Sequence, residues 1–298
     1  MKVLNFGSLN VDYVYKVHHI VQKGETQLAL SRSIFPGGKG LNQSIALKRA
    51  GLSVFHAGSI GSGGEFLLDI LNDENVDTSM VRSLKEVPVG HTIIQNSMDG
   101  DNSILVYGGA NRAITQSQIE DTLKHFSKGD YLILQNEVNL LKEIVELAHK
   151  NGMIIVLNPS PISQIFEDFD FSMIDYLFLN EIEAKELTNS KSTDPEELID
   201  RIDEKWPYIQ VFLTLGEGGS VYIHEGEHIF QKVYKVPVVD TTSAGDTFTG
   251  FCLAGIIEGF TISQALDYAA RAAAIAVTKL GAEPSIPTKN SVKEYSFD

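Results

Sequence analysis

Residues 240–248 read DTTSAGDTF and follow a strand-like run at 233–239. A helical pattern continues from this stretch to Glu258. Ser243 and Asp246 have the spacing of a capping box, so the simplest prediction is an ordinary helix start. That prediction does not account for Gly245, since glycine in a first helical turn costs about 1 kcal/mol relative to alanine. The missing side chain would instead let an anion approach the helix-start amides, with the Asp246 carboxylate beside it to accept a proton.

A second glycine-rich helix start, FPGGKGLN, occupies residues 35–42. It matches neither the Walker A loop nor the dinucleotide pattern G-x-G-x-x-G. An ordinary turn into a helix would not need three glycines in four positions, so we expect this backbone to close over a polar ligand. The sequence therefore contains two glycine-rich helix starts, about 200 residues apart, that are each suited to a polar ligand.

Composition excludes several classes of function. The chain has 298 residues, with 39 acidic against 24 basic side chains and a formal net charge of −15. We therefore expect no nucleic acid partner, and no apolar run reaches the ~20 residues of a membrane span. Cys252 is the only cysteine, which excludes an intramolecular disulfide and a cysteine-rich zinc site. We expect a cytoplasmic protein.

Short apolar runs alternate with helical patterns along most of the chain, which predicts a parallel sheet covered by helices on both faces. The predicted strands are Val3–Phe6, Val54–Ala57, Tyr131–Leu134, Ile154–Leu157, Tyr176–Leu179 and Val211–Thr214. The predicted helices include Ser117–Phe126, Leu140–Lys150, Glu181–Thr188 and Pro195–Lys205.

Two stretches interrupt this alternation. Residues 11–35 show no helical period, and residues 91–107 have the pattern of a hairpin around Asp99-Gly100. Glycine pairs flank both stretches, so we interpret them as strands of a small lid attached to the α/β body. The alternative is a pair of surface hairpins without a function.

Further polar residues follow predicted strands. Asn10 and Asp12 could bind hydroxyl groups, although N-x-D is more often a turn. Asn180 and Glu183 have the spacing of a capping box. Residues 214–219, TLGEGG, end a strand in a glycine-rich turn, which is a weak signal by itself.

Together these segments resemble the PfkB (ribokinase-type) family of carbohydrate kinases, in order and over nearly the whole chain. The matching stretches are residues 7–12, 37–46, 109–111, 135–137, 157–159, 180–187, 214–219, 239–250 and 274–287. The resemblance implies a three-layer α/β/α sandwich with a small β-sheet lid. It assigns residues 1–10, 37–87 and 108–298 to the body and residues 11–36 and 88–107 to the lid, which often forms a homodimer contact.

The resemblance also implies an activity, the transfer of the γ-phosphate of ATP to a terminal hydroxyl of a free sugar. By position, Asp246 is the base, and the Ala244 and Gly245 amides form the anion hole. The implied sugar contacts are Asn10, Asp12, Gly38, Lys39, Asn42 and Glu137. Asn180 and Glu183 correspond to the segment that helps to place Mg²⁺ and phosphate. Thr214, Gly216 and Gly219 belong to the segment that corresponds to the nucleotide contacts.

An activating monovalent cation, usually K⁺, is implied as well. Its matching positions are Asp240, Thr242, Ala276, Lys279, Gly281 and Ser285, mostly through backbone carbonyls. Asp240 supplies the charge, and capping of its own turn is a compatible role.

The chain departs from the family pattern at three places. Ser243 stands where Gly or Ala is usual, the loop at 61–65 is short, and Asn136 and Asn139 flank Glu137 where Leu and Pro are common. D-ribose is the expected acceptor. Fructose, another sugar or a nucleoside with a base stacked on Tyr13, Tyr15 or Tyr107 is the alternative. A sugar-sensing protein without catalysis is a third hypothesis, against which stand the base and the anion hole.

Overall fold

The apolar runs of the sequence assemble into one large sheet. The computed structural model describes residues 1–297, and nine strands of this part are hydrogen-bonded in the order β13-β12-β11-β10-β9-β8-β1-β4-β5. All six predicted strands lie in this sheet and pair in parallel, as their continuous burial requires. The strands are β1 (Val3–Phe6), β4 (Val54–Ser62), β5 (Asp77–Pro88), β8 (Tyr131–Gln135), β9 (Ile154–Asn158), β10 (Tyr176–Asn180), β11 (Gln210–Thr214), β12 (Ser220–His224) and β13 (Glu227–Gln231).

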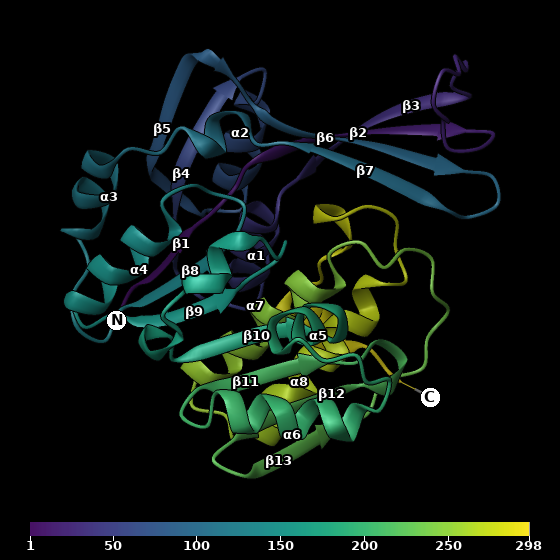
Figure 1. The fold of residues 1–298 in the computed structure, drawn as a ribbon. Coiled ribbons are helices and arrows are strands. Elements are labelled where there is room, and N and C mark those ends of the chain that lie inside the picture. Colours follow the sequence, from purple (N-terminus) through teal and green to yellow (C-terminus); the bar gives the residue numbers. More distant parts are fainter. Residues whose placement is uncertain (298) are drawn as a thin grey trace.

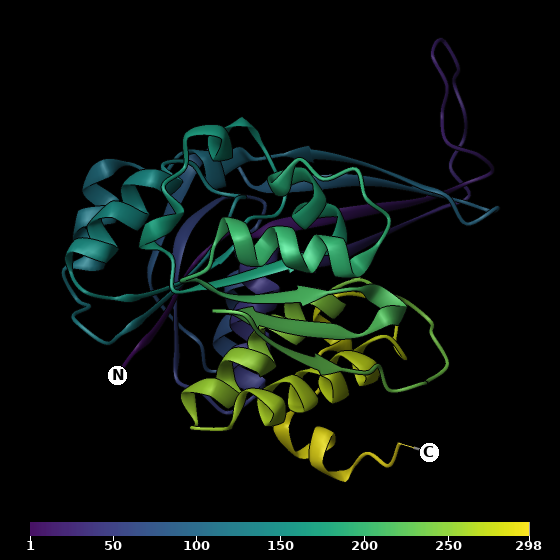
Figure 2. The same ribbon diagram turned by 60° about the horizontal axis from the view of Figure 1, so that its bottom comes forward.

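Helices cover both faces of the large sheet, which gives the predicted three-layer α/β/α sandwich (Figures 1 and 2). One hydrophobic cluster joins a sheet face to α1 (Lys39–Arg49), α2 (Glu65–Asp73), α7 (Ala244–Ile257), α8 (Ile262–Ala276) and α9 (Lys289–Glu294). A second cluster joins the opposite face to α3 (Gln116–Leu123), α4 (Leu141–Lys150), α5 (Glu181–Thr188) and α6 (Pro195–Lys205). Short 3₁₀ turns are η1 (Gly109–Arg112), η2 (Gln164–Asp168), η3 (Phe171–Met173), η4 (Gly216–Gly218) and η5 (Glu283–Ser285).

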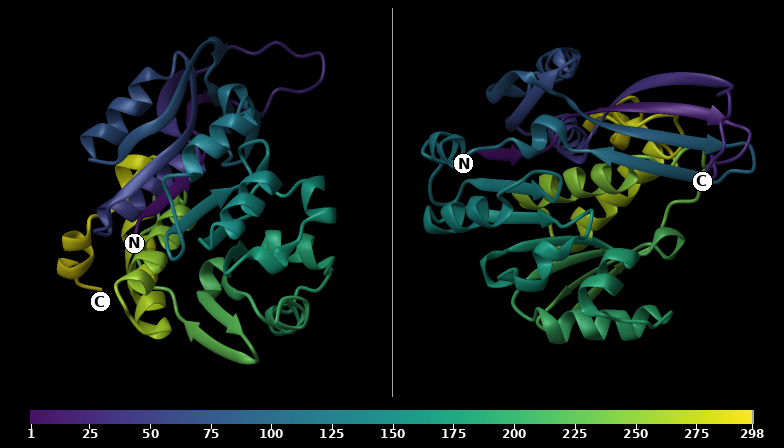
Figure 3. Two further views of the ribbon diagram at one scale, coloured as in Figure 1. Left: turned by 90° about the vertical axis from the view of Figure 1, so that its left-hand side faces the viewer. Right: turned by 45° about the horizontal axis from the view of Figure 1, so that its top comes forward.

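A separate sheet of four strands projects from the body (Figures 1 and 3). Its order is β3 (Ser31–Gly37), β2 (Asn10–Val17), β6 (Gly90–Ser97) and β7 (Asn102–Tyr107). The β6–β7 pair is the hairpin predicted from Asp99-Gly100, and Gly100 adopts the positive φ of 96° that favours glycine in such a turn. We call these four strands the lid sheet; the assignment of residues 11–36 and 88–107 to a functional lid remains a prediction.

The predicted strand at 233–239 is wrong. These residues belong to no sheet, and Val233, Val238 and Val239 are exposed. The segment alternates like a strand, but Pro237 lacks the N–H that a ladder needs. The chain instead crosses from β13 to α7, held where the Val239 amide donates to Val277 O at 2.8 Å. Strands β5, β12 and β13 were missed, since β5 and β13 mix polar with apolar residues and β12 is a short run between glycine-containing turns.

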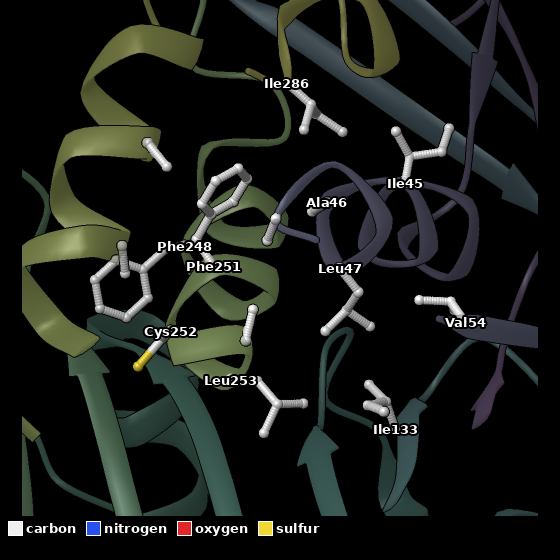
Figure 4. Packing of buried hydrophobic residues seen from close by; sticks show 14 of the residues in the cluster. Ile45, Ala46, Leu47, Val54, Ile133, Phe248, Phe251, Cys252, Leu253 and Ile286 are labelled. Atoms are coloured by element: carbon white, nitrogen blue, oxygen red, sulfur yellow. The ribbon is translucent and has the colours of Figure 1, made fainter. Parts of the chain in front are cut away.

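Close packing of α1 on α7 aligns the two glycine-rich helix starts (Figure 4). A Cβ at Gly250 would lie 2.5 Å from the Ala46 Cβ, so only glycine allows the helices to approach this closely. Leu47 and Phe251 are buried in the same cluster. The contact fixes the first turns of the two helices side by side. No helix among residues 1–297 is long and apolar enough to cross a membrane.

Candidate functional site

The last residue of each of four neighbouring parallel strands in the large sheet is polar. These residues are Gln135 on β8, Asn158 on β9, Asn180 on β10 and Thr214 on β11. Ligands of open α/β sheets bind outside the carboxyl ends of the strands. A cavity of about 220 Å³ lies at this edge.

Six of the predicted site residues line this cavity: Lys39, Asn180, Glu183, Thr214, Gly245 and Asp246. Seven other lining residues had no role predicted from the sequence, namely Asn158, Phe178, Leu179, Phe212, Thr241, Phe248 and Thr249. The position of Asn158 at the end of a strand was the only sequence signal among them. The three phenylalanines look like ordinary core residues in the sequence.

Asp246 does not cap its own helix. Ser243 is the N-cap residue of α7, but it makes no side-chain cap, so the capping-box prediction is wrong. Ser243 has the left-handed φ of 61°, and its hydroxyl donates to Ala282 O at 3.1 Å. The Asp246 carboxylate accepts from Asn42 Nδ2 and from Gln43 Nε2, each at 2.9 Å. Asp246 is therefore held by α1, at the wall of the cavity.

Nothing in the fold requires a glycine at position 245. It is the second residue of α7, and a Cβ placed there would meet no atom within 4 Å. Every other glycine of residues 1–297 with such open surroundings has a positive φ, whereas Gly245 has none. The space beside it belongs to the cavity. The Ala244 amide donates to Thr241 O at 3.2 Å, which leaves it less available than predicted for an anion hole.

A second polar group surrounds Ser8, next to the cavity. The Ser8 hydroxyl donates to Glu137 Oε2, which also accepts from the Lys39 amide at 3.0 Å. A Cβ at Gly38, whose φ is 94°, would lie 3.1 Å from the Asn10 amide nitrogen. These contacts bring four of the predicted sugar contacts together.

Asp12 and Asn42 complete this group. Thr92 Oγ1 donates to Asp12 Oδ1 at 2.6 Å, and a Cβ at Gly37 would lie 2.0 Å from Asp12 Oδ2. Burial raises the pKa of Asp12 above its ordinary value, with a smaller contribution from Glu137. The buried Asn42 Oδ1 has no partner among the described residues, which suits a ligand hydroxyl that donates to it.

Lys39 connects the two halves of the site. Burial lowers the pKa of its ammonium group, but the carboxylates of Asp246, Glu137 and Glu183 outweigh this and raise the pKa above its ordinary value. Lys39 is therefore a fixed positive charge in a chain whose net charge is −15. A phosphoryl group in the cavity would find that charge beside it.

The three tyrosines of the lid sheet lie away from this group, whereas Phe35 is the cross-strand neighbour of Asp12. Tyr13 packs edge-on against His91, and His91 packs against Tyr107. Neighbouring residues of a strand point to opposite faces, so Tyr13 and Tyr15 lie on the face opposite Asp12. The predicted base platform is thus absent from the face that carries Asp12.

Asn180 and Glu183 form the capping box that the sequence predicted, and both also line the cavity. Glu183 Oε2 accepts from the Asn180 amide and Oε1 from Asn180 Nδ2, each at 2.9 Å. Gly216 and Gly219 are not among the lining residues. A Cβ at Gly219 would lie 2.1 Å from Gln231 O, so packing against β13 explains that glycine.

The predicted cation residues lie in the loop before α7, at the end of α8 and in the segment that follows α8. Asp240 Oδ1 accepts from the Thr242 amide at 2.9 Å, and Oδ2 accepts from the Gly281 amide at 2.9 Å. Burial raises the pKa of Asp240, but the hydrogen bond from the Thr242 hydroxyl and these two amide bonds outweigh it and lower the pKa below its ordinary value. Ser285 Oγ lies 3.2 Å from Ser243 Oγ. The buried Ala276 carbonyl accepts from the Lys279 amide at 3.1 Å, and Lys279 itself is exposed.

The two asparagines beside Glu137 have structural partners. Asn136 Nδ2 donates to Ser163 Oγ at 2.8 Å, and Asn139 Nδ2 donates to Ile114 O at 2.9 Å. Their amides hold neighbouring loops and do not alter the group around Ser8.

The fold and the site define a phosphotransferase that acts on an alcohol group. The family model for the pfkB family carbohydrate kinases matches residues 1–289. The chain belongs to this family.

Curated relatives and solved structures agree with this assignment. A ribokinase of Haemophilus influenzae is 32% identical over 295 residues, covering 97% of this chain and 96% of that protein. A ribokinase of Bacillus subtilis is 33% identical, with 97% of each chain covered. The structure of Arabidopsis thaliana ribokinase complexed with ribose and ATP has a TM-score of 0.87 at 28% identity, covering 99% of each chain. A Burkholderia thailandensis nucleoside kinase in complex with inosine, at 20% identity and a TM-score of 0.79, shares the fold.

Proposed function

We propose that this protein transfers the γ-phosphate of ATP to the terminal hydroxyl of D-ribose. Curated ribokinases that match nearly the whole chain, and the neighbour structure with ribose and ATP, support this substrate pair. One observation carries the proposal: the buried Asp246 carboxylate and the open Gly245 share the first turn of α7 at the wall of one cavity. A base and an anion-binding backbone are therefore within reach of the same reacting group.

Asp246 acts as the general base. Its carboxylate takes the proton of the sugar hydroxyl as the oxygen attacks the γ-phosphorus, and the bond from that phosphorus to the ADP oxygen breaks. The products are the sugar phosphate and ADP. The Gly245 amide at the start of α7 donates to the phosphoryl oxygens as their charge builds up, and the Lys39 ammonium balances that charge.

The sugar would bind in the group around Ser8, through Asn10, Asp12, Gly38, Lys39, Asn42 and Glu137. Carboxylates and amides alternate there, which suits a ring with several hydroxyl groups that both donate and accept. Stacking of a nucleoside base on Tyr13 or Tyr107 is disfavoured, since both rings lie on the other face of the lid sheet. Fructose or another small sugar is the alternative acceptor.

The nucleotide would occupy the cavity near Asn180, Glu183 and Thr214. Mg²⁺ bound with ATP would neutralise phosphate charge, and it prefers oxygen ligands while keeping several waters. Each Glu183 oxygen accepts one hydrogen bond, so lone pairs remain for such waters. For K⁺ we propose a site formed by the Asp240 carboxylate and nearby backbone carbonyls, since both are hard oxygen donors. The residues of this site would be Asp240, Thr242, Ala276, Lys279, Gly281 and Ser285.

The protein would also form a homodimer through its lid sheet. Four apolar residues of that sheet are strongly exposed: Ile34 at 47%, Ile104 at 55%, Leu105 at 67% and Val106 at 56%. An exposed apolar strand edge usually marks a partner surface. Light scattering should give the mass of a dimer, and Leu105→Glu the mass of a monomer.

An acceptor screen tests the proposed function directly. ADP release would be followed with ribose, fructose, 2-deoxyribose and adenosine, each with and without K⁺. The proposal expects the highest kcat/KM for ribose and activation by K⁺. A preference for fructose would reassign the substrate, and sugar binding in calorimetry without turnover of any acceptor would point to a sensor.

A further inference from the structure

A chain of buried side-chain amides leads from Asp246 into the core. Asp246 Oδ1 accepts from Gln43 Nε2 at 2.9 Å, and Gln43 Oε1 accepts from Gln135 Nε2 at 2.6 Å. The Gln135 amide group also donates to Asn5 Oδ1 at 3.0 Å. Gln43, Gln135 and Asn5 are each 0% exposed. We call these three residues the amide relay.

One backbone carbonyl fixes the direction of every amide in the relay. Asn5 Nδ2 donates to Gly40 O at 2.7 Å, and a carbonyl can only accept. The Asn5 oxygen must therefore face Gln135, which has to present its NH₂ group. The Gln43 oxygen then faces that group, and the Gln43 NH₂ group is turned onto Asp246. A donor at the carboxylate follows from the backbone of α1.

The Gln135 side chain is oriented so that its NH₂ group is hydrogen-bonded while its oxygen is not. Its Oε1 is buried and has no partner among residues 1–297. A buried acceptor without a partner is destabilising, so a purely structural glutamine would be expected to satisfy both ends. The orientation instead serves Asn5 and Gln43.

We propose that Gln43 and Gln135 are positioning residues for the catalytic base, because the amide relay holds an N–H donor on Asp246 Oδ1. Such a donor stabilises the charged carboxylate and fixes its plane. If the Gln43 amide were reversed, its oxygen would face Oδ1 and repel it. Gln135 prevents this reversal from a distance, without lining the cavity. The inference rests on the proposed role of Asp246.

The experiment compares Gln135→Met, Gln43→Met and the double variant in the full chain. Loss of one charge-assisted donor predicts that kcat falls about 10- to 100-fold in each single variant. The KM values for sugar and ATP should stay near those of the unchanged protein. Because Gln135 acts through Gln43, the double variant should lose no more than Gln43→Met alone.

Gln118→Met is the matched control. Gln118 is also a buried glutamine, and its amide donates to Gly58 O at 2.6 Å, away from the relay. It should lose similar thermal stability and keep its kcat. Gln135→Glu is the second variant if Gln135→Met does not fold. The glutamate has the shape of the Gln135 side chain but presents oxygen acceptors to Gln43, so it should lower kcat as much as Gln135→Met.

Two results would overturn the inference. One is an unchanged kcat in both Gln135 variants; the other is a kcat loss in the double variant equal to the product of the single losses. Asp246→Asn separates this from the proposed function. If Asp246→Asn keeps a normal kcat, the base itself is wrong, whereas a large loss there with normal Gln135 variants rejects only the relay.

Discussion

Gly245→Ala separates the requirements of the fold from those of catalysis. The new Cβ would meet no protein atom within 4 Å, and Gly245 lacks a positive φ, so the fold accepts alanine. Alanine is favoured over glycine in helices by about 1 kcal/mol, which for a chain of this size raises Tm by about 2 °C at most. The methyl group would project into the cavity beside the helix-start amides.

Although Gly245→Ala should slightly raise Tm, it should lower kcat. Removal of one donor of an oxyanion hole lowers kcat by about 10²- to 10³-fold, and we expect a loss of this order. Steady-state kinetics and thermal unfolding on the same samples measure both effects. Ser117→Ala, at the second position of α3, controls for a change at a helix start and should leave kcat unchanged. A Gly245→Ala variant with normal kcat would refute an anion site at α7.

Three further predictions concern single residues. Burial lowers the pKa of His56 from 6.5 to about 4, so the unfolded chain takes up a proton first and stability falls as pH drops from about 6.5 to about 4. Denaturant titrations should show about 3 kcal/mol of this loss, and His56→Gln should lack it. Ser243→Gly should be more stable than Ser243→Ala by about 1 kcal/mol in urea unfolding, since only glycine relieves the φ of 61°; equal stabilities would contradict this. Lys39→Met should lower kcat/KM about 100-fold, because three carboxylates lose their cation; a loss below tenfold would be too small for the proposed role.

The sequence predicted the layers of the fold because buried parallel strands are continuously apolar. It failed at 233–239, where Pro237 interrupts an otherwise strand-like pattern. It also failed at β5 and β13, which mix polar with apolar residues, and at β12, a short run between glycine-containing turns. Long-range packing decides such edges, and local pattern does not report it.

The candidate site was predicted unevenly for a similar reason. Glycines and carboxylates at helix starts mark Gly245 and Asp246, while Phe178 and Phe212 look like core in any sequence. The capping-box prediction failed because Asp246 bonds to α1, about 200 residues away, and only the α1–α7 contact at Gly250 places those helices together. The relay through Gln43 and Gln135 has no local signal at all.

Asp246→Asn is the decisive variant for the proposed role of Asp246 as the base of a phosphoryl transfer. Turnover of ribose and ATP would be measured together with sugar affinity by calorimetry. We expect kcat to fall about 10²- to 10⁴-fold while the sugar still binds with nearly unchanged affinity. A variant that keeps near-normal kcat would contradict it.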